Sequence, residues 1–87
     1  MITAAQMRAA RALLGIDQRQ LAELAGVSVP TVQRMEASDG TVRGVIDTLM
    51  KIVEALDRAG VELIGDNAVS RSGGRGVRLK HPAERTP

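Results

Sequence analysis

The chain of 87 residues contains no phenylalanine, tryptophan or tyrosine. This absence argues against nucleic-acid modules that stack unpaired bases on aromatic side chains. Hydrophobic residues nevertheless make up 44% of the chain, so the core of this one small domain must be aliphatic and close-packed, which favours helices. Any recognition of bases has to use hydrogen bonds and alkyl contacts.

Cysteine is also absent, and His81 is the only histidine. Neither a disulfide framework nor a Cys/His zinc site can be assembled within one chain, so no metal or other cofactor is expected. Catalytic motifs are missing too, because His81 follows no Ser-His-Asp pattern and the glycine-rich run at 73–76 lacks the Gly-Lys-Ser/Thr ending of a phosphate-binding loop. We therefore expect no enzymatic activity.

Long hydrophobic runs are missing as well. No 18 apolar residues follow one another, and no charged segment at the N-terminus leads into an apolar one, so we expect a cytoplasmic protein. The net charge of +2 suggests a nucleic-acid partner. Residues 1–65, however, contain seven basic and eight acidic groups, and residues 66–87 contain five and two. The positive excess belongs to the C-terminal segment.

The first half of the chain repeats one helix-start pattern, in which a capping residue is followed three positions later by a glutamine. Thr3 with Gln6 and Asp17 with Gln20 show this capping box, and Ser28 can cap a third helix. Apolar residues at helical spacing predict a fourth helix, the longest of the set. The expected helices span residues 4–14, 18–25, 29–37 and 45–58.

Beyond Gly60 the periodicity changes. Residues 61–64 and 77–80 alternate apolar and polar side chains, and a segment rich in Gly, Ser and Asn separates them, which predicts a hairpin or strand pair. Two strands alone are marginal in water and leave open edges, so we predict that the strands of two chains pair in a dimer. A hairpin folded on its own helices is the alternative. The strand residues in question are Val61, Leu63, Ile64, Val77 and Leu79.

The second and third helices have the spacing of a helix-turn-helix. Gly26 joins them, where the chain needs a positive φ, and Ala22 lies four residues earlier, where the two helices cross. Val32 and Met35 can pack the third helix against Leu21 and the first helix. The alternative is a small helical bundle that binds no ligand.

The run from residue 18 to residue 36, QRQLAELAGVSVPTVQRME, resembles the helix-turn-helix of the Cro and phage-repressor (XRE) family of transcriptional regulators. The resemblance covers roughly residues 3–58. It implies a mainly α fold with a four-helix repressor-like DNA-binding domain at 1–60. From the residues beyond this domain we expect a dimerisation element of β-strands at 61–80 and a disordered tail at 81–87, which departs from the family pattern. Many relatives have a fifth helix where this chain has its alternating runs.

The resemblance implies that the third helix lies in the major groove of double-stranded DNA. The homodimer predicted from the strands would then bind a palindromic or near-palindromic operator. Arg34 can pair with guanine, Gln33 can contact a base edge or a phosphate, and Val29 and Pro30 can touch thymine methyl groups. Gln18 is expected to bind a phosphate at the start of the second helix. The further expected backbone contacts are Arg19, Ser28, Thr31 and Arg43.

Two more expectations remain open at this point. Arg11 and Glu36 match positions that form a structural ion pair in related repressors, and two unconnected surface charges are the alternative. The cations Arg71, Arg75, Arg78 and Lys80 either follow DNA phosphates or only aid solubility.

A different class of function is a protein-binding module, such as an antitoxin or adaptor, that captures a partner through its C-terminal strands.

Overall fold

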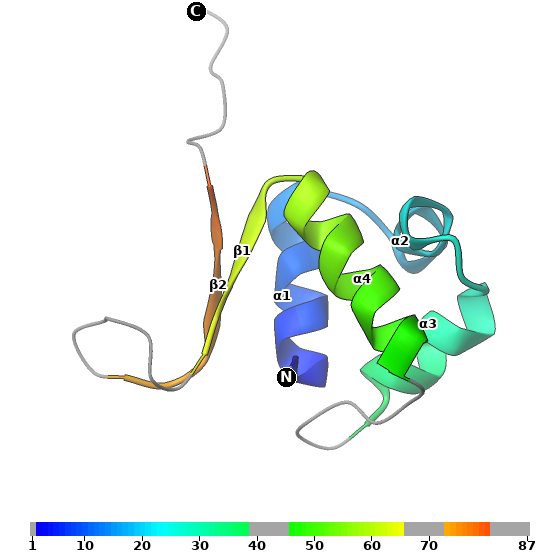
Figure 1. Cartoon of the computed structure of the whole chain (residues 1–87), viewed down its shortest axis with the longest axis horizontal. Coiled ribbons are helices and arrows are strands. Elements are labelled where there is room, and N and C mark those ends of the chain that lie inside the picture. The colour runs from blue at the N-terminus through cyan, green and yellow to red at the C-terminus, as the bar shows by residue number, and fades with distance from the viewer. Residues whose placement is uncertain (1, 39–45, 66–72, 81–87) are drawn as a thin grey trace, which may run out of the picture.

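The computed structural model describes residues 2–38, 46–65 and 73–80. It contains four helices, α1 (Ala4–Leu14), α2 (Gln18–Ala25), α3 (Val29–Glu36) and α4 (Ile46–Arg58), followed by two strands, β1 (Val61–Ile64) and β2 (Gly76–Leu79) (Figure 1). The predicted fold class, four helices followed by a short strand pair, is confirmed.

The predicted capping residues all start helices. The Thr3 side chain accepts a hydrogen bond from the Gln6 backbone N–H at 3.1 Å, and the Gln6 amide oxygen accepts one from the Thr3 N–H at 2.9 Å. Asp17 and Gln20 repeat this reciprocal pair at 2.8 and 2.9 Å. Ser28 caps α3 through the Thr31 N–H. These bonds satisfy backbone donors that the first turn of a helix leaves free.

The turns between the first three helices depend on glycine. Gly15 and Gly26 have φ values of 68° and 70°, in the left-handed region that a side chain disfavours. The N–H of the residue after each one bonds back to the preceding helix, from Ile16 to the Arg11 carbonyl and from Val27 to the Ala22 carbonyl, each at 3.0 Å. Each glycine therefore ends one helix and sets the direction of the next.

The second strand begins and ends one residue earlier than predicted. It spans Gly76–Leu79 rather than residues 77–80, because Gly76 pairs with Ile64 at the far end of the ladder. The third helix likewise ends at Glu36, one residue early, with Ala37 as its C-cap. Val45, predicted to begin the fourth helix, and most of the predicted connection at 38–44 lie outside the described residues.

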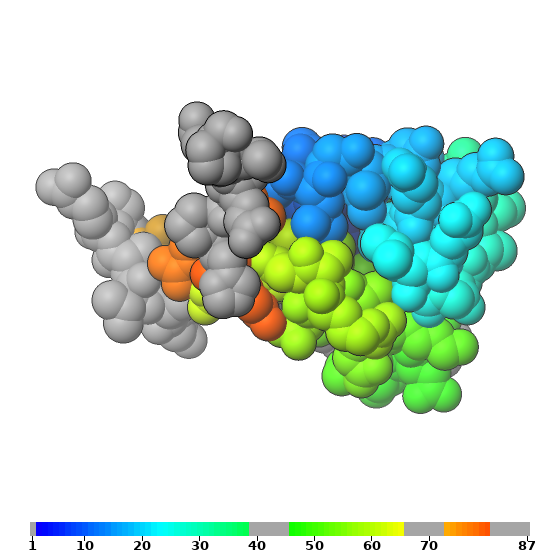
Figure 2. All heavy atoms as spheres, turned by 90° about the horizontal axis from the view of Figure 1, so that it is seen from above, coloured from blue at the N-terminus to red at the C-terminus, as the bar shows by residue number. Residues whose placement is uncertain are grey.

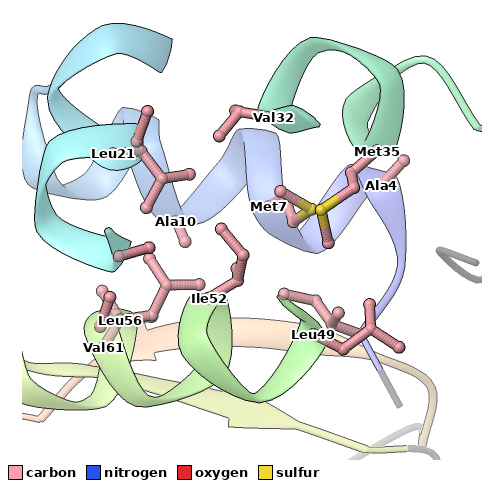
Figure 3. Packing of buried hydrophobic residues seen from close by; sticks show 14 residues of the cluster. Ala4, Met7, Ala10, Leu21, Val32, Met35, Leu49, Ile52, Leu56 and Val61 are labelled. Atoms are coloured by element: carbon pink, nitrogen blue, oxygen red, sulfur yellow. The ribbon is translucent and has the colours of Figure 1, made fainter. Parts of the chain in front are cut away.

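All four helices contribute to one aliphatic core (Figure 3). Burying each large side chain of this kind stabilises the fold by about 1.5 to 3 kcal/mol. The core joins the helix-turn-helix to α1 and α4, and α3 packs against α1 and α2. Its largest fully buried members are Ile2, Met7, Leu21, Val32, Ile52, Leu56 and Val61.

The strands form an antiparallel hairpin within the chain, in which Val61 pairs with Leu79. Val61 is buried, and Leu63, Val77 and Leu79 pack against the core. Figures 1 and 2 show the hairpin at one end of the helical body, with α2 and α3 at the other. Pairing within one chain is thus observed, whereas pairing between two chains stays a prediction.

Among the described residues, none of the helices combines the length and the apolar character needed to cross a membrane.

Candidate nucleic-acid interface

The third helix has one buried and one exposed face. Val32 and Met35 point into the core, where they are 0% and 3% exposed. Pro30, Gln33 and Arg34 are exposed. Three of the four residues predicted to contact bases therefore lie on the solvent face of a helix whose other face is fixed by packing.

Val29, the fourth predicted base contact, has a different environment. It is half-buried and packs against the core at the start of α3. Only part of this side chain remains available to a thymine methyl group, so Val29 also anchors the first turn of α3. Pro30 beside it is exposed, and its missing N–H costs nothing in the first turn of a helix.

The two hydroxyl groups at the start of α3 bond to each other. Ser28 Oγ lies 2.7 Å from Thr31 Oγ1 and also accepts the Thr31 N–H at 3.2 Å. Two hydroxyl groups have two hydrogens, and the bond between them uses one. One O–H donor therefore remains at this helix end for a phosphate oxygen, where the helix dipole already favours an anion.

Gln18 and Arg19, the other two described candidates for phosphate contact, open α2. The Gln18 amide nitrogen donates to Glu36 Oε1 at 3.1 Å, a contact that links α2 to the end of α3. Arg19 is exposed and pairs with Glu23 at 3.5 Å, one helical turn later. Such a surface pair is weak, so Arg19 can exchange its partner for a phosphate. Arg43 lies outside the described residues.

Arg11 and Glu36 form a bidentate ion pair between α1 and α3. Arg11 Nε lies 2.7 Å from Glu36 Oε2, and Arg11 Nη2 lies 2.7 Å from Glu36 Oε1. The Glu36 side chain is 3% exposed and the Arg11 side chain 20%. The hydrogen bond with Glu36 raises the pKa of Arg11 above its usual value. The pair fixes the end of α3 against α1.

Two residues that sequence reasoning did not assign to this site hold neighbouring elements in place. Arg8 Nη1 donates to the Glu36 carbonyl at 2.5 Å and so satisfies the end of α3, which has no left-handed cap. Gln6 is 4% exposed, and its amide nitrogen donates to the carbonyls of Ile64 and Gly76 at 3.0 and 2.9 Å. The capping box identified Gln6, but only its oxygen serves the cap.

The cations of the hairpin have acidic partners within the chain. Arg78 pairs with Glu62 at 2.6 Å across the two strands, and Lys80 pairs with Asp57 at the end of α4. Contact of Arg78 or Lys80 with DNA would have to compete with these pairs. Arg71, which was grouped with them in the sequence, lies outside the described residues. Arg78 and Lys80 are therefore each engaged by a carboxylate of this chain.

The left-handed Gly26 sets α3 against α2, and α3 packs on α1. Because α3 also exposes a polar face, this arrangement defines a helix-turn-helix DNA-binding protein. A family model described as Helix-turn-helix matches residues 7–63. The chain belongs to this family, the Cro/C1-type XRE helix-turn-helix proteins, and the resemblance found in the sequence is confirmed. The protein is thus a DNA-binding regulator of transcription. No curated protein has a significantly similar sequence.

Proposed function

We propose that this protein binds duplex DNA sequence-specifically as a homodimer, with α3 of each subunit in the major groove. One observation carries the proposal: α3 buries Val32 and Met35 and exposes Gln33 and Arg34. The planar guanidinium of Arg34 matches the two acceptors on the major-groove edge of guanine, and the Gln33 amide can bond to a base or a phosphate. Pro30 and the accessible part of Val29 supply alkyl contacts.

Backbone contacts are proposed at the starts of α2 and α3. The Asp17 side chain accepts the N–H of Gln20, which leaves the first two backbone N–H groups of α2 available to an anion. The Gln18 amide and the Ser28–Thr31 hydroxyl pair add donors near these helix starts. Phosphate contacts of this kind set affinity and register without reading sequence. Arg19 and Arg43 complete the proposed set.

One feature supports a homodimer that uses the element at 61–80 as its interface, next to the DNA-binding domain at 1–60. A two-stranded sheet leaves hydrogen-bonding groups at its edges, and pairing with a second chain would satisfy them. Ile46 and Met50 of α4, which are 68% and 45% exposed, lie outside this element and are the alternative surface for a dimer. A two-fold dimer presents two recognition helices to half-sites about 34 Å apart.

Selection of bound duplexes from a random pool by the native chain tests the proposal. We expect one recovered motif with two-fold symmetry and half-sites about one helical turn apart. Recovery of sequences without a common motif would contradict sequence-specific binding. A single asymmetric half-site would contradict the homodimer but not DNA binding.

A protein-binding module, such as an antitoxin or adaptor, is the second candidate. One observation favours it: a mainly apolar groove of about 260 Å³ between α4 and β1, where Met50 and Leu63 face solvent in part. The groove is lined by Ile2, Gln6, Met50, Val53, Leu63 and Gly65. A native chain that sediments as a monomer and selects no DNA motif would favour this candidate over a dimeric regulator.

A further inference from the structure

One buried carboxylate joins three helices of the DNA-binding domain. Glu36 is the last residue of α3, and its side chain is 3% exposed. Its Oε1 atom accepts hydrogen bonds from Arg11 Nη2 at 2.7 Å and from Gln18 Nε2 at 3.1 Å. Glu36 thus contacts both α1 and the first residue of α2. The ion pair with Arg11 compensates the buried charge of Glu36, but it does not explain the hydrogen bond to Gln18.

The Glu36 carboxylate determines the orientation of the Gln18 side-chain amide. A carboxylate paired with a guanidinium accepts hydrogen bonds and donates none. Only the NH₂ group of Gln18 can face Glu36, because the amide oxygen would meet another negative oxygen there. One amide hydrogen is therefore committed to Glu36, and no acceptor in the described part of the chain takes the second.

We propose that Glu36 is a positioning residue for DNA binding, which orients Gln18 so that its second amide hydrogen is presented to a phosphate oxygen. This inference rests on the proposed function, in which Gln18 contacts the DNA backbone at the start of α2. Glu36 belongs to α3, the proposed recognition helix, and Gln18 belongs to α2. The hydrogen bond between them therefore fixes the position of the phosphate contact relative to α3. The backbone contact thereby sets the register of α3 in the groove.

A double-mutant cycle between Gln18→Met and Glu36→Met tests this coupling, because methionine at position 36 has no acceptor for the Gln18 amide. The measurement is the affinity of the full chain for a random-sequence duplex of about 30 base pairs, long enough for two half-sites. Gln18→Met should lower the affinity about threefold to tenfold in the native background, the value of one hydrogen bond. In the Glu36→Met background the same change should cost less than about twofold, because Gln18 is no longer oriented.

Arg19 supplies the matched control, since it follows Gln18 in α2 and pairs with Glu23 rather than with Glu36. Arg19→Met should lower the affinity by the same factor in both backgrounds. An equal loss for Gln18→Met in both backgrounds would overturn the inference. A merely structural role for Glu36 predicts that equal loss, so the cycle separates structure from positioning.

A second measurement covers the case in which Glu36→Met does not fold. The side-chain amide of Gln18 is followed by ¹⁵N–¹H correlation spectra of the native protein and is assigned by its loss in Gln18→Met. We expect one of its hydrogens to be shifted downfield and slow to exchange without DNA, and the other to shift when duplex is added. If both behave like those of the exposed Gln33 without DNA, the inference fails.

Failure of the inference is distinguishable from failure of the proposed function. A native chain that does not bind the duplex contradicts the proposed function itself. A native chain that binds while Gln18→Met changes nothing contradicts only the role of Gln18 and Glu36.

Discussion

At the scale of single residues, exposure separates the contacts proposed for DNA from those that build the fold. Gln33 and Arg34 are exposed beside Met35 and Glu36, which are 3% and 5% exposed. Because a helix turns by about 100° per residue, two consecutive residues can lie on the exposed face and the next two on the buried face. One short stretch of α3 can therefore supply both base contacts and anchors.

Arg34→Ala should reduce discrimination between the selected operator and random DNA. One bidentate contact to guanine contributes about 1 to 3 kcal/mol of discrimination. Titration of both duplexes at several salt concentrations measures this, and the salt-dependent background binding should persist. An equal loss of affinity on both duplexes would assign Arg34 to the phosphate backbone instead.

Arg11→Met should lower the free energy of unfolding by about 3 kcal/mol, because it leaves the Glu36 carboxylate buried without its guanidinium. Urea unfolding followed by circular dichroism measures the loss. Arg19→Met is the control, since its exposed pair with Glu23 should contribute less than about 1 kcal/mol. Similar losses for the two variants would show that the Arg11–Glu36 pair does not stabilise the fold.

The pH dependence of this pair follows from the raised pKa of Arg11. A folded-state pKa above the unfolded value contributes stability at every pH below the unfolded pKa, and that stability is lost only as the pH rises through the folded pKa. Both values lie in the strongly alkaline range of arginine. The difference between native chain and Arg11→Met should therefore not change through titration of Arg11 between about pH 6 and about pH 9.

At the scale of elements, α1 connects the hairpin to the helix-turn-helix. Its first turn carries Gln6, which bonds to both strands, and its next turns carry Arg8 and Arg11, which bond to the end of α3. A buried amide with all its partners present constrains geometry more than an apolar residue does, because an altered position leaves polar groups unsatisfied. The hairpin thus has a defined orientation on α1.

Gln6→Met should destabilise the chain more than Gln20→Met by about 1 to 3 kcal/mol. Both residues complete a capping box, but only Gln6 also donates to the Ile64 and Gly76 carbonyls. The difference between the two variants in urea unfolding therefore isolates the contact with the hairpin. Hydrogen exchange should accelerate in β1 and β2 of Gln6→Met. Equal destabilisation by the two substitutions would show that the contact contributes nothing.

At the scale of the whole molecule, α3 and the hairpin lie at opposite ends of the helical body (Figure 1). The backbone N–H of Lys80 donates to the Gly60 carbonyl at 2.7 Å, next to the Val61–Leu79 pair of the ladder. In an antiparallel ladder, positions that bond to the partner strand alternate with positions that do not, so Val61 and Leu79 form a non-hydrogen-bonded pair. The N–H of Leu79 therefore points away from β1, toward the outer edge of β2. This edge is where a second chain can add its strand.

If the proposed dimer forms through this edge, Leu79→Pro should give a monomer in sedimentation experiments, because proline removes the outward N–H without breaking a bond between β1 and β2. Leu79→Ala is the matched control, since it loses the same packing but keeps the N–H and should remain dimeric. A dimer that persists in Leu79→Pro would place the interface elsewhere, with exposed Ile46 and Met50 on α4 as the next surface to change.

Much of the fold could be predicted because its signals are local. Capping boxes, left-handed glycines and helical spacing act within a few residues, and the helix starts at Ala4, Gln18 and Val29 follow from them. The one-residue shift of β2 could not be predicted, because strand register depends on the partner strand. Exposure of Arg34 followed from helical spacing, whereas the half-buried state of Val29 depends on how closely α3 approaches the core.

The sequence by itself determined the class of protein, since the helix-turn-helix and its family can be identified from residues 18–36. Only the tertiary structure decided which side chains join the elements. Gln6 reaches the hairpin across 58 and 70 positions, and Arg8 reaches Glu36 across 28. Hydrogen bonds between residues so distant in the chain leave no periodic pattern, because they depend on packing that brings separate elements together.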